Sequence, residues 1–153
     1  MNYNIAIVQL PLVRESAGQR VRTPQEVYDV CQDIAELAQE TFHVLTLSAK
    51  NGLINRHLVS LGTADSALVH PREVFRCAIN DGAVVAVVLV HSHPSGDPTP
   101  SSEDIRITRQ LIEAGKIMDI RVMDHIVIGR VGGMSTVPYL SMRESGLCSF
   151  DVG

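Results

Sequence analysis

Residues 83–104 read AVVAVVLVHSHPSGDPTPSSED, an apolar run followed by two histidines and a loop rich in proline and serine. Residues 83–90 contain no polar side chain. A strand without polar alternation is covered on both faces, so these residues are predicted to form the central strand of a sheet. Helical patterns lie before and after the strand, which predicts an α/β (mixed α+β) domain with helices on both sides of a mixed sheet.

The residues after this strand have the composition of a divalent metal site. Side chains alternate between the faces of a strand, so His91 and His93 point the same way from its end. The glycine and three prolines of residues 94–100 favour turns, so the chain can fold back and present Asp104. Two imidazoles, one carboxylate and a water form a common catalytic zinc site, in which the pKa of the water is roughly 7.

Ser101 and Asp104 are also typical of a helix N-terminus. Ser101 is the expected N-cap, and Asp104 lies at the third helical position, where the helix dipole favours an acid. Both functions are compatible, because the first turn of a helix holds a ligand rigidly. The helix is predicted to continue to about Ala114, with Gly115 as its stop.

The spacing of these polar residues resembles a known family. His-x-His, seven residues, Ser, two residues and Asp form the JAMM motif of MPN-domain metalloproteases, and this chain has His91, His93, Ser101 and Asp104 in the four places. The string HPSGDPTPS resembles the version of the motif carried by RadC-type proteins. The resemblance extends over about residues 23–146, through the strings AKNGLI, VHPREVF and DHIVIG.

The resemblance implies a fold, a cofactor and a ligand set. It implies a three-layer MPN/JAB fold, similar to that of cytidine deaminases, and a zinc ion held by His91, His93 and Asp104. It also implies that Ser101 helps to position or stabilise the oxyanion of a tetrahedral intermediate. The deaminase signature of H-x-E and P-C-x-x-C is missing from the sequence, so deamination is rejected.

The same resemblance implies that a glutamate from an earlier strand is the general acid and base. Glu40 is preferred, because it comes just before the apolar segment 42–47. Glu73 is the alternative, and it ranks second because it also lies in the first turn of a predicted helix, where it complements the dipole.

Other patterns predict the remaining elements. Residues 23–39 form a helix that starts with a capping box. Residues 42–47 and 53–61 form a hairpin around Asn51-Gly52, and 70–80 form another helix. Short strands at 120–123 and 126–128 are expected to break or bend at Asp124-His125. His125 either lies near the metal, or pairs with Asp124 or with backbone.

Composition limits the class of protein. At 153 residues, with 45% apolar and 20% charged residues, the chain has the size and composition of one globular domain. The expected organisation is an N-terminal extension or edge strand at 1–22, the MPN domain at 23–146 and a tail at 147–153. Three cysteines without a CxxC pair, no export signal and no membrane span lead us to expect a cytoplasmic protein.

Two classes of function compete. The leading hypothesis is a zinc-dependent JAMM hydrolase that cleaves a peptide or isopeptide bond in a peptide or protein substrate. The alternative is a non-enzymatic accessory module in DNA repair, or a metal-dependent nuclease, because RadC-type proteins are commonly labelled DNA repair proteins. The net charge of −4 disfavours direct nucleic-acid binding. The chain resembles a short form without the helix-hairpin-helix region of longer members.

Overall fold

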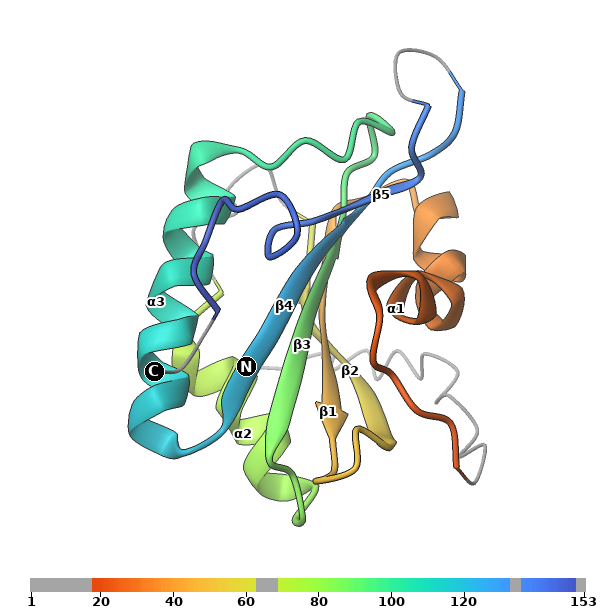
Figure 1. Cartoon of the computed structure of the whole chain (residues 1–153). Helices are drawn as coiled ribbons and strands as arrows, with labels where there is room; N and C mark the ends of the chain where they lie inside the picture. Colours follow the sequence, from red (N-terminus) through yellow and green to blue (C-terminus); the bar gives the residue numbers. More distant parts are fainter. Residues whose placement is uncertain (1–17, 63–68, 133–135, 151–153) are drawn as a thin grey trace, which may run out of the picture.

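A mixed sheet forms the middle layer of the fold (Figure 1). The computed structural model describes residues 18–62, 69–132 and 136–150. Within these residues the sheet has five strands, in the order β2-β1-β3-β4-β5. They are β1 (Thr41–Leu47), β2 (Leu53–Leu61), β3 (Ala86–Ser92), β4 (Arg121–Ile128) and β5 (Tyr139–Ser141). β3 and β4 are parallel, and the other neighbouring strands are antiparallel.

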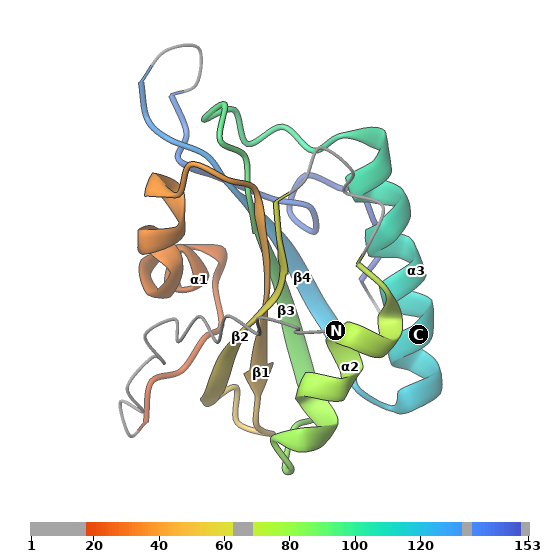
Figure 2. The same cartoon turned by 180° about the vertical axis from the view of Figure 1, so that it is seen from behind.

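Helices cover both faces of the sheet, as the sequence predicts. α1 (Pro24–Cys31) and the 3-10 helix η1 (Gln32–Glu36) lie on one face, and α2 (Pro71–Asn80) and α3 (Ser102–Met118) on the other (Figures 1 and 2). β3 is the middle strand and all its residues are buried, because each face packs into a separate core. Leu89 packs toward α2 and α3, whereas Val90 packs toward α1 and η1. The predicted mixed three-layer fold is confirmed.

The predicted hairpin is also confirmed. β1 and β2 are antiparallel and joined by a turn in which Asn51 has a φ of 57°. Asparagine tolerates this left-handed conformation better than most residues. Because β1 also pairs antiparallel with β3, the start of β1 lies beside the end of β3, with Phe42 opposite His91.

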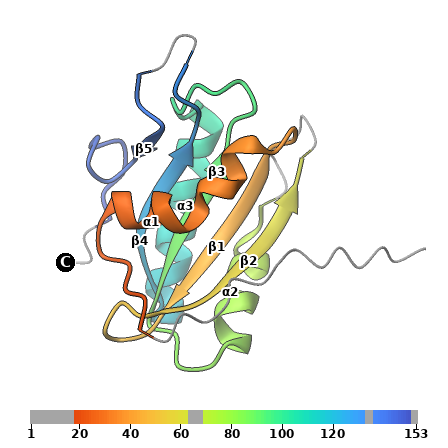
Figure 3. The same cartoon turned by 90° about the vertical axis from the view of Figure 1, so that its right-hand side faces the viewer.

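The first helix ends earlier than the predicted Gln39. Its capping box is present, with the Thr23 hydroxyl accepting from the backbone N–H of Glu26. The α-helix stops at Cys31 and continues as η1. Arg56, on β2, donates to the carbonyl of Val30 at 3.1 Å and makes two short bonds with Asp33. The Arg56 side chain therefore occupies a backbone carbonyl at the end of the α-helix. Figure 3 shows α1 and η1 lying across this face.

Gly115 does not stop α3, and this prediction was wrong. The helix runs on to Met118 and ends at Asp119, which has a left-handed φ of 54°. Gly115 serves close packing instead. A Cβ at this position would lie 2.5 Å from the carbonyl oxygen of Ile120 and 3.3 Å from the ring of Phe75.

Gly115→Ala is therefore expected to destabilise the protein. Alanine gains about 1 kcal/mol over glycine in helix propensity. Its Cβ would clash with a backbone carbonyl, and the shift of packed elements that follows should outweigh this gain by roughly 1–3 kcal/mol. Urea unfolding would measure the net loss. Gln110→Ala, on an exposed position of the same helix, should change stability by less than about 0.5 kcal/mol. Equal stability of Gly115→Ala and the wild type would contradict this account.

β4 is one continuous strand rather than the two that the sequence predicts. Its register against β3 shifts once, so that Met123 is an extra residue between the partners of Val87 and Val88. The buried carboxylate of Asp124 is accommodated because it accepts from the Ser141 hydroxyl at 2.5 Å and from the backbone N–H groups of His125 and Arg143. A satisfied polar residue therefore does not break the strand.

The two ends of the chain fall partly outside the described residues. The predicted N-terminal extension or edge strand at 1–22 lies outside them up to residue 17, and Arg20 forms an isolated antiparallel bridge with Gly52. Of the predicted tail, Cys148 and Phe150 are buried in the core beside α3. None of the helices in the described part is long and apolar enough to cross a membrane.

An ion pair far from the end of β3 gives a pH prediction. Nε2 of His57 lies 2.6 Å from a carboxylate oxygen of Asp81. Hydrogen bonding to Cys77, and then to Asp81, raises the pKa of His57 to about 9. Because the folded-state pKa lies above the ordinary value near 6.5, the stabilisation is complete below pH 6.5 and is lost as the pH rises through about 9.

The free energy of unfolding should therefore fall between pH 6.5 and 9.5. We expect a loss on the order of 2 kcal/mol, reduced from the full linkage value because the pair is partly exposed to solvent. Urea titrations across this range measure it, with His57→Gln as the comparison. A slope that persists unchanged in His57→Gln would assign the pH dependence to another group.

Candidate metal centre

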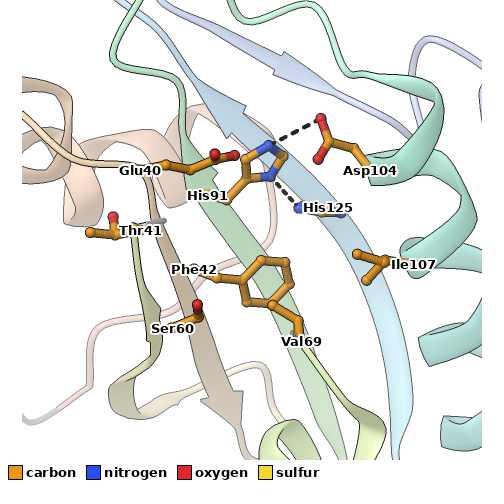
Figure 4. A pocket seen from close by; sticks show the side chains of 10 residues that line it. Glu40, Thr41, Phe42, Ser60, Val69, His91, Asp104, Ile107 and His125 are labelled. Carbon is orange, nitrogen blue, oxygen red and sulfur yellow. Dashed lines mark hydrogen bonds and ion pairs between the residues drawn. The ribbon is translucent and has the colours of Figure 1, made fainter. Parts of the chain in front are cut away.

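Four side chains meet at the carboxyl end of β3. One potential ligand atom from each of Glu40, His91, His93 and Asp104 lies within 4.8 Å of all the others. Glu40 immediately precedes β1, His91 lies near the end of β3 and His93 directly follows it, and Asp104 is in the first turn of α3. Figure 4 shows Glu40 and Asp104 on either side of the His91 ring. The antiparallel pairing of β1 with β3 is what brings Glu40 to the histidines.

His93 is held in one tautomer by the loop that follows it. Its Nδ1 lies 2.8 Å from the carbonyl oxygen of Asp97. A carbonyl can only accept, so Nδ1 carries the proton and Nε2 faces the cluster. The loop is itself fastened, because Arg130 donates from its backbone to the carbonyl of Gly96 and from its side chain to the carbonyl of Pro94, both at 2.8 Å.

Asp104 is oriented by the start of α3. The Ser101 hydroxyl accepts from the backbone N–H of Asp104, and the Asp104 carboxylate accepts from the backbone N–H of Ser101 at 2.8 Å. This capping box confirms the predicted helix start. It also fixes the carboxylate toward the histidines, since the same oxygen lies 3.4 Å from Nε2 of His91 and 3.3 Å from Nε2 of His93.

The separations between these atoms fit a metal ion. Ligands about 2.0–2.2 Å from a tetrahedral zinc lie roughly 3.3 Å from one another. Here Nε2 of His91 and Nε2 of His93 are 2.9 Å apart, and the carboxylate oxygen of Asp104 lies 3.3 and 3.4 Å from them. The group can therefore bind a metal ion.

The electrostatics favour a charged carboxylate in the cluster. Burial of Asp104 would by itself raise the pKa of the carboxyl group, but the neighbouring imidazoles of His91 and His93 outweigh it and hold this pKa far below its usual value. Burial lowers the pKa of His93, yet the contacts with Asp104 and with the carbonyl of Asp97 leave it raised overall. The site thus contains an anionic carboxylate beside two imidazoles.

The two candidate glutamates have different surroundings. Glu73, in the first turn of α2, lies 3.4 Å from Arg72 and 3.5 Å from Arg76 and is not part of the group of four. Glu40 lines a small pocket with His91, whose apolar wall includes Phe42, Val69 and Ile107 (Figure 4). The structure therefore brings Glu40, and not Glu73, to the candidate ligands.

His125 shows both of the contacts that the sequence left open. Its backbone N–H donates to Asp124 at 2.7 Å, and its Nε2 lies 2.7 Å from Nδ1 of His91. Burial holds the pKa of His125 well below its usual value, so the ring is neutral. Its other nitrogen meets the hydroxyl of Thr108 on α3.

Sequence reasoning missed Thr108 as a part of this site, because it sits among apolar residues on the buried face of a helix. The signal available in the sequence was that Thr108 is a polar residue on an otherwise largely apolar helix face. A second signal was the polar pair Asp124-His125 inside the apolar strand β4.

A mixed sheet between helices, with histidines and an acid converging at the end of its central strand, is the arrangement of a JAB/MPN domain. The chain belongs to the RadC-like JAB domain family, whose model matches residues 21–147.

Curated relatives agree with this assignment. The chain is similar to a UPF0758 protein of Symbiobacterium thermophilum, with 50% identity over 125 residues, which cover 81% of this chain and 50% of the relative. A UPF0758 protein of Syntrophomonas wolfei is 45% identical over 132 residues, covering 83% and 53% of the two chains. One from Listeria monocytogenes is 42% identical over 139 residues, covering 90% and 59%. The chain thus spans about half the length of the curated relatives it matches, and their names describe no activity.

Proposed function

We propose that this chain is a zinc-dependent hydrolase of the JAMM type that cleaves a peptide or isopeptide bond in a peptide or protein substrate. The convergence of Glu40, His91, His93 and Asp104 is the observation that carries the proposal. Membership of the JAB family supports it, because JAB domains are often metallohydrolases.

His91, His93 and Asp104 would hold the zinc, and Glu40 stays outside the ligand set. Zinc bound there would polarise the substrate carbonyl and lower the pKa of a water molecule to about 7. The carboxylate of Glu40 accepts a proton from the attacking water and then delivers it to the leaving amine.

Ser101 stabilises the negative charge that develops on the carbonyl oxygen of the substrate. Its oxygen accepts from the backbone N–H of Asp104, so its own proton remains available for donation. A hydroxyl that donates to the developing oxyanion stabilises the transition state more than the ground state. Phe42, Val69 and Ile107 give the pocket beside His91 an apolar wall.

A cleavage assay with the zinc-loaded chain tests the proposal. Pools of linear and isopeptide-linked peptides, and separate samples of single- and double-stranded DNA, would be incubated with the protein and analysed by mass spectrometry. We expect new peptide termini that disappear with a chelator and return with added zinc. Cleavage of DNA but not of peptides would replace the proposal with a nuclease, and intact substrates in every pool would refute hydrolysis.

A further inference from the structure

A chain of hydrogen bonds runs from His91 to the backbone of α3. Nδ1 of His91 lies 2.7 Å from Nε2 of His125, and Nδ1 of His125 lies 2.5 Å from the hydroxyl oxygen of Thr108. That hydroxyl lies 2.6 Å from the carbonyl oxygen of Asp104. The three side chains come from β3, β4 and α3 and are 2%, 1% and 0% exposed, so water does not compete for these bonds.

The last acceptor in this series of hydrogen bonds determines which atom donates in each bond. The carbonyl of Asp104 can only accept, so the Thr108 hydroxyl proton points to it and the Thr108 oxygen accepts from Nδ1–H of His125. A neutral imidazole has one N–H, and therefore Nε2 of His125 is an acceptor. Nδ1–H of His91 donates to it, which leaves a lone pair on Nε2 of His91 directed at His93 and Asp104.

We propose that Thr108 and His125 are positioning residues that select the Nδ1–H tautomer of His91, and so keep its Nε2 free for the metal. The inference rests on the proposed metal site, although not on the hydrolysis of any substrate. Metal-bound histidines commonly donate their second N–H to a carbonyl or carboxylate, and here a neutral histidine takes that place.

Packing holds the rings in the orientation that this chain needs. The Phe42 ring stacks on the His91 ring, with centroids 6.1 Å apart and an interplanar angle of 10°. The same phenyl ring meets His125 edge-on at 5.4 Å. Rotation of either imidazole away from its hydrogen bond would require Phe42 to move.

The arrangement also couples the ligands to one another. The chain from His91 ends on the backbone of Asp104, whose carboxylate is a second candidate ligand. His93 is fixed separately by the carbonyl of Asp97 in the loop. A change at Thr108 should therefore reach His91 while leaving the tautomer of His93 intact.

Substitutions at Thr108 can test separately the effect of the hydroxyl group and the effect of the side-chain volume. Thr108→Val removes the hydroxyl and keeps the shape, whereas Thr108→Ser keeps the hydroxyl. In competition with a chromophoric chelator, we expect Thr108→Val to bind zinc about 10-fold more weakly than the wild type, and Thr108→Ser to bind nearly as well. Thr46→Val is the matched control, because Thr46 is equally buried and its hydroxyl bonds to Asp81 at the other end of β1. It should retain the wild-type zinc affinity.

Nitrogen NMR of the histidine rings in the metal-free protein gives a second measurement. We expect His91 protonated on Nδ1 in the wild type, and a mixture of tautomers in Thr108→Val. His91 protonated on Nε2 in the wild type, or equal zinc affinity of Thr108→Val and the wild type, would overturn the inference. If the wild type took up no zinc, the metal site itself would fall, and the tautomer would still show whether Thr108 and His125 act as proposed.

Discussion

Replacing both His91 and His93 by alanine is expected to abolish zinc binding at one equivalent per chain. Both Nε2 atoms face Asp104 within 3.4 Å, so the double variant removes two of the three proposed ligands and leaves one carboxylate. Changes in residues that merely orient ligands commonly weaken metal binding by about 10–100-fold. Because the double variant lacks two ligands, its zinc affinity should fall by more than about 100-fold.

Elemental analysis of the purified, untagged proteins measures this effect directly. We expect about one zinc per wild-type chain and none in His91→Ala/His93→Ala. His57→Gln is the matched control, since His57 pairs with Asp81 and is not part of the candidate site. Full zinc content in the double variant would show that His91 and His93 do not hold the zinc, and would refute the proposed function.

Glu40→Gln should separate binding from catalysis. Glutamine has nearly the shape of glutamate but cannot accept a proton from water, so zinc should remain bound while hydrolysis slows by about 10²–10⁴-fold. Zinc content and turnover would be measured on the same preparation, with any peptide that the wild type cleaves. Unchanged turnover would show that Glu40 is not the base.

Glu73→Gln provides the comparison for this experiment. Glu73 lies beside Arg72 and Arg76 on α2, outside the group around His91, so its substitution should leave turnover close to the wild-type value. The opposite pattern, with activity lost in Glu73→Gln and retained in Glu40→Gln, would transfer the role of general base to Glu73.

Local patterns in the sequence determined the central strand and the candidate ligands. The apolar residues before His91 require cover on both faces, which predicted a central strand, and the helical patterns before and after it predicted the covering helices. His91 and His93 share a direction because of the two-residue period of a strand, and Ser101 and Asp104 are related by the geometry of a helix start. These relations involve neighbours in the chain, so the sequence is sufficient to predict them.

Contacts between distant segments decided what the sequence left open. The sequence favoured Glu40 over Glu73 but left both open, and the pairing of β1 with β3 brought Glu40 to the histidines. Gly115 looked like a helix stop, but the turn of chain at Ile120 packs so closely against it that only glycine fits. The sequence left open whether His125 lies near the metal or pairs with Asp124 or backbone, and the packing of separate elements set its ring against His91 and Thr108. The physical reason is common to all three, because sequence periodicity sets which way a side chain points, and only the register and packing of separate elements set what it meets.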